Sequence, residues 1–265
     1  MYNVSNENFK NIIKSIIELL KDNKFTFEKL KKEDKKSYSY EFDLDKLIEI
    51  FSGYLEKEIE QKENKKIIIN YYGNPYLTGM LCAESIMNQT ESTFVINNIH
   101  YGLNSAIIKI VNDALKENNI ELKFKVIMNF MIQEVERMNV NKVVCLGDTN
   151  SYMIYKNLKN TKVECVPLFG TTLYYDSSQY DKLVEDMKKY AFKNGYELEV
   201  FDENEQLDDV IYMINKTENN YCSLLLSKDK EKQEKFTQQV NAKMVCVNEN
   251  PFAKFKLEVP KELWN

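Results

Sequence analysis

The residues of this chain that could do chemistry lie in three short polar turns. The first turn, in the run YYGNPYLTG, contains Gly73, Asn74 and Pro75. Gly73 permits a tight backbone turn and Pro75 suits the start of a helix, so this loop could present backbone amides to a ligand. Asn74 has a side-chain amide that can donate a hydrogen bond, but asparagine is equally a common turn residue.

The second and third turns offer polar groups without positive charge. Asn97 and Asn98 follow an apolar run in VINNIHYG, and Gly147 and Thr149 follow another in LGDTNSYMIY. Asparagine can bind a ribose hydroxyl but supplies no charge for a phosphate. Asp148, beside Thr149, is a good helix N-cap, but its carboxylate would repel a phosphate.

The thiols and the single histidine indicate neither covalent nor metal chemistry. The five cysteines are Cys82, Cys145, Cys165, Cys222 and Cys246; no two of them form a CxxC pair, and four of the five lie in apolar runs. A nucleophilic thiol needs exposure and a lowered pKa, and neither is indicated, so the sequence predicts packing residues in a reducing compartment. His100 is predicted to be a surface residue, and no metal site is expected.

Alternating elements must position the three turns. From Lys66 onward, short apolar runs alternate with stretches of helical spacing. The apolar runs lie at 67–72, 93–97, 122–128, 142–147 and 162–168. This alternation predicts a three-layer α/β fold with a mostly parallel, Rossmann-type sheet. Because ligands bind beyond the carboxyl ends of parallel strands, we expect the three turns to line one pocket.

The chain divides into three regions by pattern. Residues 1–65 have helical periodicity, residues 66–170 hold the strand–helix series described above, and residues 171–265 hold a second series. In the last region strands are predicted near Glu197, Leu224 and Met244. Between Tyr175 and these strands lies one long amphipathic helix.

Composition limits the classes of function. The 265 residues are 43% hydrophobic and 29% charged, as in a globular protein, and the net charge of −5 argues against a nucleic-acid surface. No run approaches the roughly 18 apolar residues that a membrane helix needs. The N-terminus has no signal-peptide pattern, so we expect a cytoplasmic protein without a membrane partner.

The order of these segments resembles the aldehyde dehydrogenase superfamily, which includes related acyl-CoA reductases. The resemblance covers roughly residues 66–252 and rests on the Asn-Pro turn, the VIN and LGDTNS strand ends, and the strand–helix run from Asp202 to Phe252. In that family an asparagine at the position of Asn74 helps to stabilise the oxyanion, and such a donor is worth about 3 kcal/mol.

The resemblance also implies a cofactor site. The family's second turn contacts the cofactor ribose, and its third approaches the pyrophosphate. NAD or NADP is therefore the candidate cofactor, although the residues alone do not name one. The residues matched to the cofactor are Gly73, Pro75, Asn97, Asn98, Gly147 and Thr149.

Other family positions are altered. Asn97 replaces the family's lysine, and Pro167 stands where the family has its general-base glutamate, although proline accepts no proton. The family's glycine-rich loop with a nucleophilic cysteine has no counterpart before the amphipathic helix that follows Tyr175. The chain is also shorter than typical members, and the strand that links their subunits has no clear equivalent.

Three hypotheses remain. The leading one is a pseudoenzyme that binds a small ligand or a protein without covalent catalysis. The alternative is an NAD(P)-dependent oxidoreductase of an aldehyde or acyl thioester that uses Asn74 for the oxyanion. The third is an interaction protein that uses its helical N-terminus, and a homo-oligomer is compatible with each.

Overall fold

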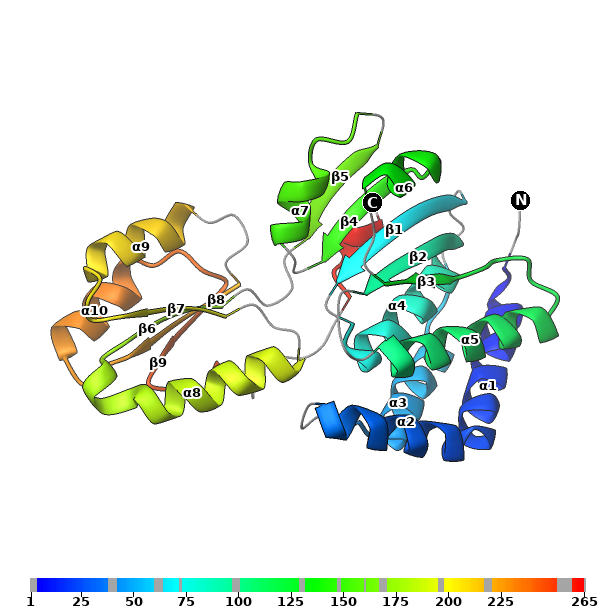
Figure 1. The fold of residues 1–265 in the computed structure, drawn as a ribbon, viewed down its shortest axis with the longest axis horizontal. Helices are drawn as coiled ribbons and strands as arrows, with labels where there is room; N and C mark the ends of the chain where they lie inside the picture. Colours follow the sequence, from blue (N-terminus) through cyan, green and yellow to red (C-terminus); the bar gives the residue numbers. More distant parts are fainter. Residues whose placement is uncertain are drawn as a thin grey trace. The chain divides into compact units, whose positions relative to one another are not determined.

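The protein was analysed as a computed structural model, which divides into two compact units. The first comprises Met1–Cys165 with Glu258–Asn265, and the second comprises Val166–Leu257. Figure 1 shows the elements of each unit. The structure describes residues 4–37, 42–59, 64–71, 73–96, 101–128, 132–146, 149–159, 161–166, 171–194, 198–216, 221–251 and 259–264.

A five-stranded sheet forms the centre of the first unit. Its strands are β1 (Lys65–Tyr71), β2 (Thr90–Ile96), β3 (Lys125–Ile127), β4 (Lys142–Leu146) and β5 (Lys162–Val166). Their spatial order is β3-β2-β1-β4-β5, and β1 pairs in parallel with both β2 and β4. Ile67, Ile68 and Ile69 of β1 are all buried, as expected for a central strand covered on both faces. The predicted parallel α/β fold is confirmed.

The predicted strand at 122–128 is longer than the observed β3. The side chain of Asn112 binds both backbone groups of Phe124: its Oδ1 accepts from Phe124 N at 2.9 Å, and its Nδ2 donates to Phe124 O at 2.9 Å. These groups are therefore bonded to a helix side chain instead of a neighbouring strand. Leu122 and Phe124 are still buried, so the apolar run was recognised correctly but only its end is a strand.

Helices cover both faces of this sheet. They are α4 (Pro75–Met87), α5 (Tyr101–Glu117), α6 (Ile132–Arg137) and α7 (Thr149–Tyr155). Val135 of α6 and Tyr155 of α7 pack on one face, against Ile68 and Val143. The other face contacts α4 and α5 (Figure 1).

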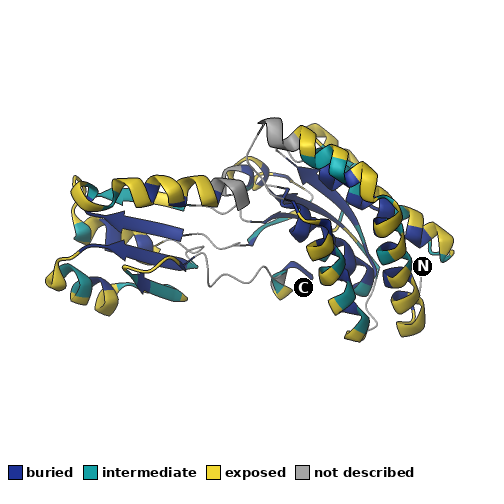
Figure 2. Cartoon of the chain, turned by 90° about the horizontal axis from the view of Figure 1, so that it is seen from below, coloured by how far each residue is buried: buried dark blue, intermediate teal, exposed yellow. Residues whose placement is uncertain are grey.

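The N-terminal helices form a further layer outside α4 and α5. They are α1 (Asn6–Asp22), α2 (Lys24–Ser37) and α3 (Leu44–Gly53), followed by the short η1 (Tyr54–Glu56). Helix α1 contacts α3 and α5, and α3 contacts α4, with buried apolar stripes facing inward (Figure 2). Gly79 of α4 allows this close approach, because a Cβ atom there would lie 2.7 Å from Leu47 Cδ1.

The second unit is built on a four-stranded parallel sheet. Its strands are β6 (Thr171–Tyr175), β7 (Leu198–Asp202), β8 (Cys222–Leu226) and β9 (Met244–Val247), in the order β7-β6-β8-β9. Its helices are α8 (Ser177–Asn194), α9 (Leu207–Lys216) and α10 (Lys230–Gln239). Helix α8 covers one face, and α9 and α10 cover the other. The strands predicted near Glu197, Leu224 and Met244 are β7, β8 and β9.

The last described segment of the chain belongs to the first unit. The short η3 (Lys261–Trp264) buries Leu263 and Trp264, and Lys65 Nζ donates to Trp264 O at 3.4 Å. In the described ranges, no helix combines the length and the apolar character that crossing a membrane requires.

Candidate functional site

The carboxyl edge of the first sheet brings the ends of β1, β2 and β4 side by side. Tyr71 at the end of β1 pairs with Ile96 at the end of β2, and Asn70 pairs with Cys145 of β4. Strand β1 lies between β2 and β4, where the winding of the sheet reverses (Figure 1). Ligands bind at such switch points in open parallel sheets. We call this place the ligand edge: residues 73–75 together with the last residues of β1, β2 and β4.

Only part of the predicted site lies in the described residues. Gly73, Asn74 and Pro75 are described, and Thr149 is the first residue of α7. Asn97, Asn98, Gly147 and Asp148 lie outside the described residues, as do His100 and Pro167. In the sequence, Asn97 follows β2 and Gly147 follows β4. Their assignment to a cofactor stays a prediction.

Asn74 is the N-cap of α4. Gly73 has φ 79, a left-handed conformation that glycine adopts without strain, and Pro75 is the first helical residue. The Asn74 Oδ1 atom accepts hydrogen bonds from Tyr76 N at 3.0 Å and Leu77 N at 3.2 Å. Any hydrogen bond that the side chain donates must therefore come from Nδ2.

The first turn of α4 uses its own backbone amides internally. Pro75 has no N–H, Tyr76 and Leu77 donate to Asn74 Oδ1, and Thr78 N donates to Asn74 O at 2.9 Å. The amides of Tyr76, Leu77 and Thr78 are therefore bonded within the helix, and the presentation of other amides of this turn to a ligand stays a prediction. A phosphate would gain no donor from these three amides.

A buried polar cluster lies beneath the turn. Tyr71 of β1, Thr78 of α4 and Asn104 of α5 are almost completely buried. Thr78 Oγ1 lies within hydrogen-bond distance of Tyr71 Oη and Asn104 Oδ1, and it donates to Asn74 O at 3.0 Å. Asn104 Nδ2 donates to Gly73 O at 2.6 Å. Burial raises the pKa of Tyr71, so its phenol stays protonated and can donate.

Sequence reasoning missed this cluster, although one signal was present. Asn104 interrupts the apolar positions of α5, where Leu103, Ile107 and Ile108 are buried. A buried polar residue must find partners, so its position within an apolar helix could have marked it. Its partner, the Gly73 carbonyl, is 31 residues away in the chain and could not be identified from the pattern.

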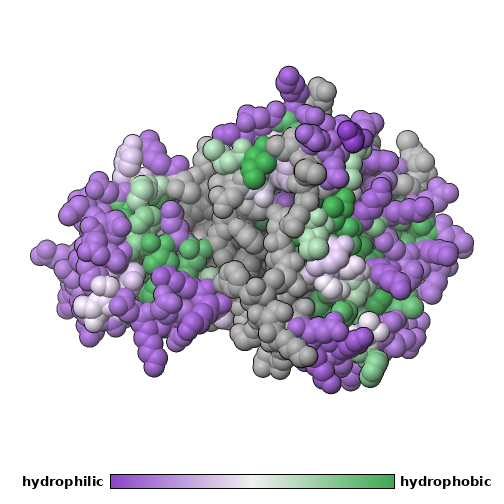
Figure 3. Space-filling model, in the orientation of Figure 1, coloured by the Kyte–Doolittle hydropathy of each residue, from purple (hydrophilic) through white to green (hydrophobic). Residues whose placement is uncertain are grey.

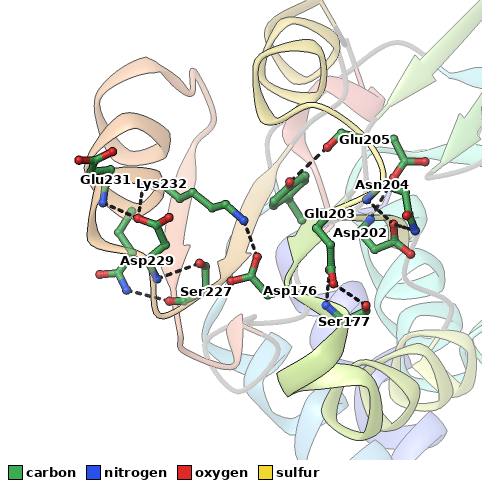
Figure 4. Close-up of polar contacts among 12 residues, drawn as sticks. Asp176, Ser177, Asp202, Glu203, Asn204, Glu205, Ser227, Asp229, Glu231 and Lys232 are labelled. Carbon is green, nitrogen blue, oxygen red and sulfur yellow. Dashed lines mark hydrogen bonds and ion pairs between the residues drawn. The ribbon is translucent and has the colours of Figure 1, made fainter.

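The carboxyl edge of the second sheet carries polar groups that are paired with one another (Figure 4). Lys232 Nζ lies 2.7 Å from Asp176 Oδ1, and this contact raises the pKa of Lys232. Ser177 Oγ donates to Glu203 Oε1 at 2.7 Å, and Ser177 N also donates to this carboxylate. These contacts hold α8 and α10 on the strand ends, so they have a structural role.

Solved structures of known proteins resemble this chain over most of its length. Gamma-glutamyl phosphate reductase from Thermotoga maritima aligns with a TM-score of 0.56 and 13% identity, over 94% of this chain and 84% of that chain. Glyceraldehyde-3-phosphate dehydrogenase GapN from Methanocaldococcus jannaschii, in complex with NADP, aligns with a TM-score of 0.57 and 13% identity, over 96% and 83%. An acetylating aldehyde dehydrogenase from Geobacillus thermoglucosidasius aligns with a TM-score of 0.56 and 8% identity, over 93% of this chain and 82% of that chain. The chain has the aldehyde dehydrogenase fold.

This similarity confirms the expected fold and concerns the fold alone, because the identities are very low. No protein-family model matches the sequence, and no curated protein matches it. Asn74 lies in the turn between β1 and α4, and its assignment to the oxyanion stays a prediction.

The cysteines of this aldehyde dehydrogenase fold lie inside regular elements. Cys145, Cys222 and Cys246 are buried in strands, and Cys82 is buried in α4. Cys165, in β5, is half-buried. Burial raises the pKa of the Cys82 thiol, which disfavours the reactive thiolate. The expectation that these four buried cysteines are packing residues is confirmed.

The described part of the ligand edge fits the cofactor poorly. Gly73, Asn74 and Pro75 carry no positive charge, and the amides of Tyr76, Leu77 and Thr78 already donate to Asn74. Among the described residues no three His, Cys, Asp or Glu side chains gather as a metal ion would require.

Proposed function

We propose that this protein is an aldehyde-dehydrogenase-like pseudoenzyme, a scaffold that binds a small ligand or a protein without covalent catalysis. The observation that carries the proposal is the position of the cysteines. All five lie in helices or strands, and four of them are buried. Covalent catalysis by a thiol requires an exposed thiolate beside the substrate, activated by a base or a helix N-terminus.

The ligand edge is the proposed binding place. The switch point beside β1 is where open parallel sheets bind ligands, and the side chain of Asn74 in the turn caps α4. The binding of a protein has separate support from exposed apolar side chains. Met153 and Ile154 of α7 are 53% and 57% exposed, whereas hydrophilic residues cover most of the described surface in Figure 3. We also propose a cytoplasmic location, since five free cysteines suit a reducing compartment.

The second candidate is an NAD(P)-dependent oxidoreductase that acts on an aldehyde or acyl thioester without a covalent intermediate. It is favoured by the similarity to GapN, which was solved with NADP. In this hypothesis Asn74 Nδ2 donates to the carbonyl oxygen of the substrate while Oδ1 caps α4.

Two measurements on the purified protein test these proposals. The first follows thermal unfolding with NAD, NADP, NADH, NADPH or CoA, and a raised Tm identifies a bound probe. The second follows absorbance of NAD(P)H after addition of an aldehyde or acyl-CoA. The pseudoenzyme proposal expects no turnover with any pair of cofactor and substrate.

Turnover that disappears in one cysteine-to-serine variant would overturn the proposal. Turnover that survives in all five such variants but disappears in Asn74→Asp would instead establish the second candidate. Asp keeps a side-chain oxygen for the cap but lacks the amide donor, which makes it the matched control for catalysis.

A further inference from the structure

The side chain of Asn104 connects α5 to the turn of the ligand edge. It is 0% exposed, and its Nδ2 donates to Gly73 O at 2.6 Å while its Oδ1 faces Thr78 Oγ1. Gly73 belongs to the turn that carries Asn74. A residue 31 positions away in the chain thus holds the backbone of the candidate site.

The hydrogen bonds of this cluster run in one direction. An amide oxygen only accepts and an amide nitrogen only donates, so Asn104 takes the hydrogen of Thr78 and gives its own to Gly73. The single hydroxyl hydrogen of Thr78 is shared between Asn104 Oδ1 and Asn74 O. Tyr71 must therefore donate to Thr78, and burial keeps Tyr71 protonated for this purpose. The order is Tyr71 to Thr78 to Asn104 to Gly73.

The last hydrogen bond of this series, from Asn104 to Gly73, fixes the orientation of the Gly73–Asn74 peptide group. The peptide is planar, so holding the Gly73 carbonyl oxygen on Asn104 sets the orientation of the whole group. Gly73 has φ 79 and, as a glycine, could adopt many other conformations. The bond from Asn104 selects one of them.

We infer that Asn104 is the positioning residue of the ligand edge: it orients the Asn74 turn and contacts no ligand itself. The inference deepens the proposed function, because it assumes that the turn faces the ligand. A different explanation is that Asn104 only satisfies a buried carbonyl, like any polar residue of a core. The two explanations differ in where a substitution has its effect.

Asn104→Asp tests the difference. The variant keeps the size of the side chain and an acceptor for Thr78, but it places an oxygen against Gly73 O. The matched control is Ser85→Ala, which removes a buried 2.8 Å hydrogen bond between Ser85 of α4 and Ser92 of β2, seven residues beyond Thr78. Both substitutions remove one buried hydrogen bond from α4 or its neighbours.

The first readout is amide hydrogen exchange in the full chain. The quantity compared is the exchange rate of the Tyr76, Leu77 and Thr78 amides divided by that of the β1 amides. In Asn104→Asp we expect this ratio to rise at least about tenfold over the parent. Ser85→Ala should leave the ratio unchanged. If the Asp variant does not fold, Thr78→Val, which removes the hydroxyl between Tyr71 and Asn104, should give the same local pattern.

The second readout is the affinity for whichever of NADH or CoA stabilises the parent protein. We expect Asn104→Asp to weaken binding by about tenfold or more while Ser85→Ala stays within about twofold. If neither probe binds the parent, these two ligands are ruled out for the proposed function, and the exchange result alone decides the role of Asn104. Equal exchange ratios in Asn104→Asp and the control would overturn the inference.

Discussion

Alkylation of the native protein with iodoacetamide at neutral pH should leave four of the five cysteines unmodified. Cys82, Cys145 and Cys222 are 0% exposed, and Cys246 is 4% exposed. Iodoacetamide reacts with thiolates that it can reach. A buried thiol reacts only when the element around it opens.

The expected protection follows from the cost of that opening. Cys145 lies in β4 and Cys222 in β8, each within the core of its unit, so exposing them requires a large part of the unit to unfold. A stability of about 5 kcal/mol is at the low end for a domain, and each 1.36 kcal/mol is a factor of ten. The buried thiols should therefore react about 10³ to 10⁴ times more slowly than in the unfolded chain.

Peptide mass spectrometry over time, in buffer and in denaturant, measures these rates. Half-buried Cys165 should react first in the native protein and so acts as an internal reference. Cys165→Ser should remove the early reaction and leave the rest unchanged. The reasoning is refuted if one of the four buried cysteines reacts within about tenfold of its unfolded rate, because such a thiol is exposed or activated.

Three further predictions concern the polar contacts. Asn74→Ala should destabilise the protein by about 1 kcal/mol in thermal or urea unfolding, because α4 loses its cap, whereas Asn74→Asp should retain most of this stability. Lys232→Met should cost about 1–2 kcal/mol, since it leaves the Asp176 carboxylate without its cation; a stability equal to the parent's would mean that water replaces the contact fully. Glu203 accepts hydrogen bonds from Ser177, which lower its pKa from 4.5 to about 2. The stabilisation of the fold by the Glu203 carboxylate is therefore present above pH 4.5 and is lost as the pH falls towards 2. Plots of Tm against pH for the parent and Glu203→Gln should converge over that range.

The fold could be predicted because its strands are continuous apolar runs between helices. β1, β4 and β8 are buried along most or all of their length, and each appears in the sequence as such a run. The prediction missed β6, whose sequence TTLYY is buried at all five positions. Its β-branched and aromatic residues favour a strand, but a buried strand lacks alternation and was merged with the connection before α8.

The candidate site was only partly predictable. The sequence located the Gly73–Asn74–Pro75 turn from local chemistry, because Gly permits backbone conformations that other residues avoid and Pro fixes φ wherever it occurs. It could not show that Asn74 already binds the amides of Tyr76 and Leu77, since this depends on a side-chain rotamer. The role of Asn104 depends on a contact between α5 and the turn after β1, which only the folded chain creates.

The cap explains why Asn74 alone cannot decide between the two proposed functions. Its Oδ1 stabilises α4 whether or not any substrate binds, so a chain without catalysis would still benefit from this residue. Only Nδ2 belongs to the proposed oxyanion role. A substitution that keeps the oxygen and removes the nitrogen therefore separates structure from chemistry at one position. Loss of turnover in Asn74→Asp, with an unchanged Tm, would assign the nitrogen to catalysis.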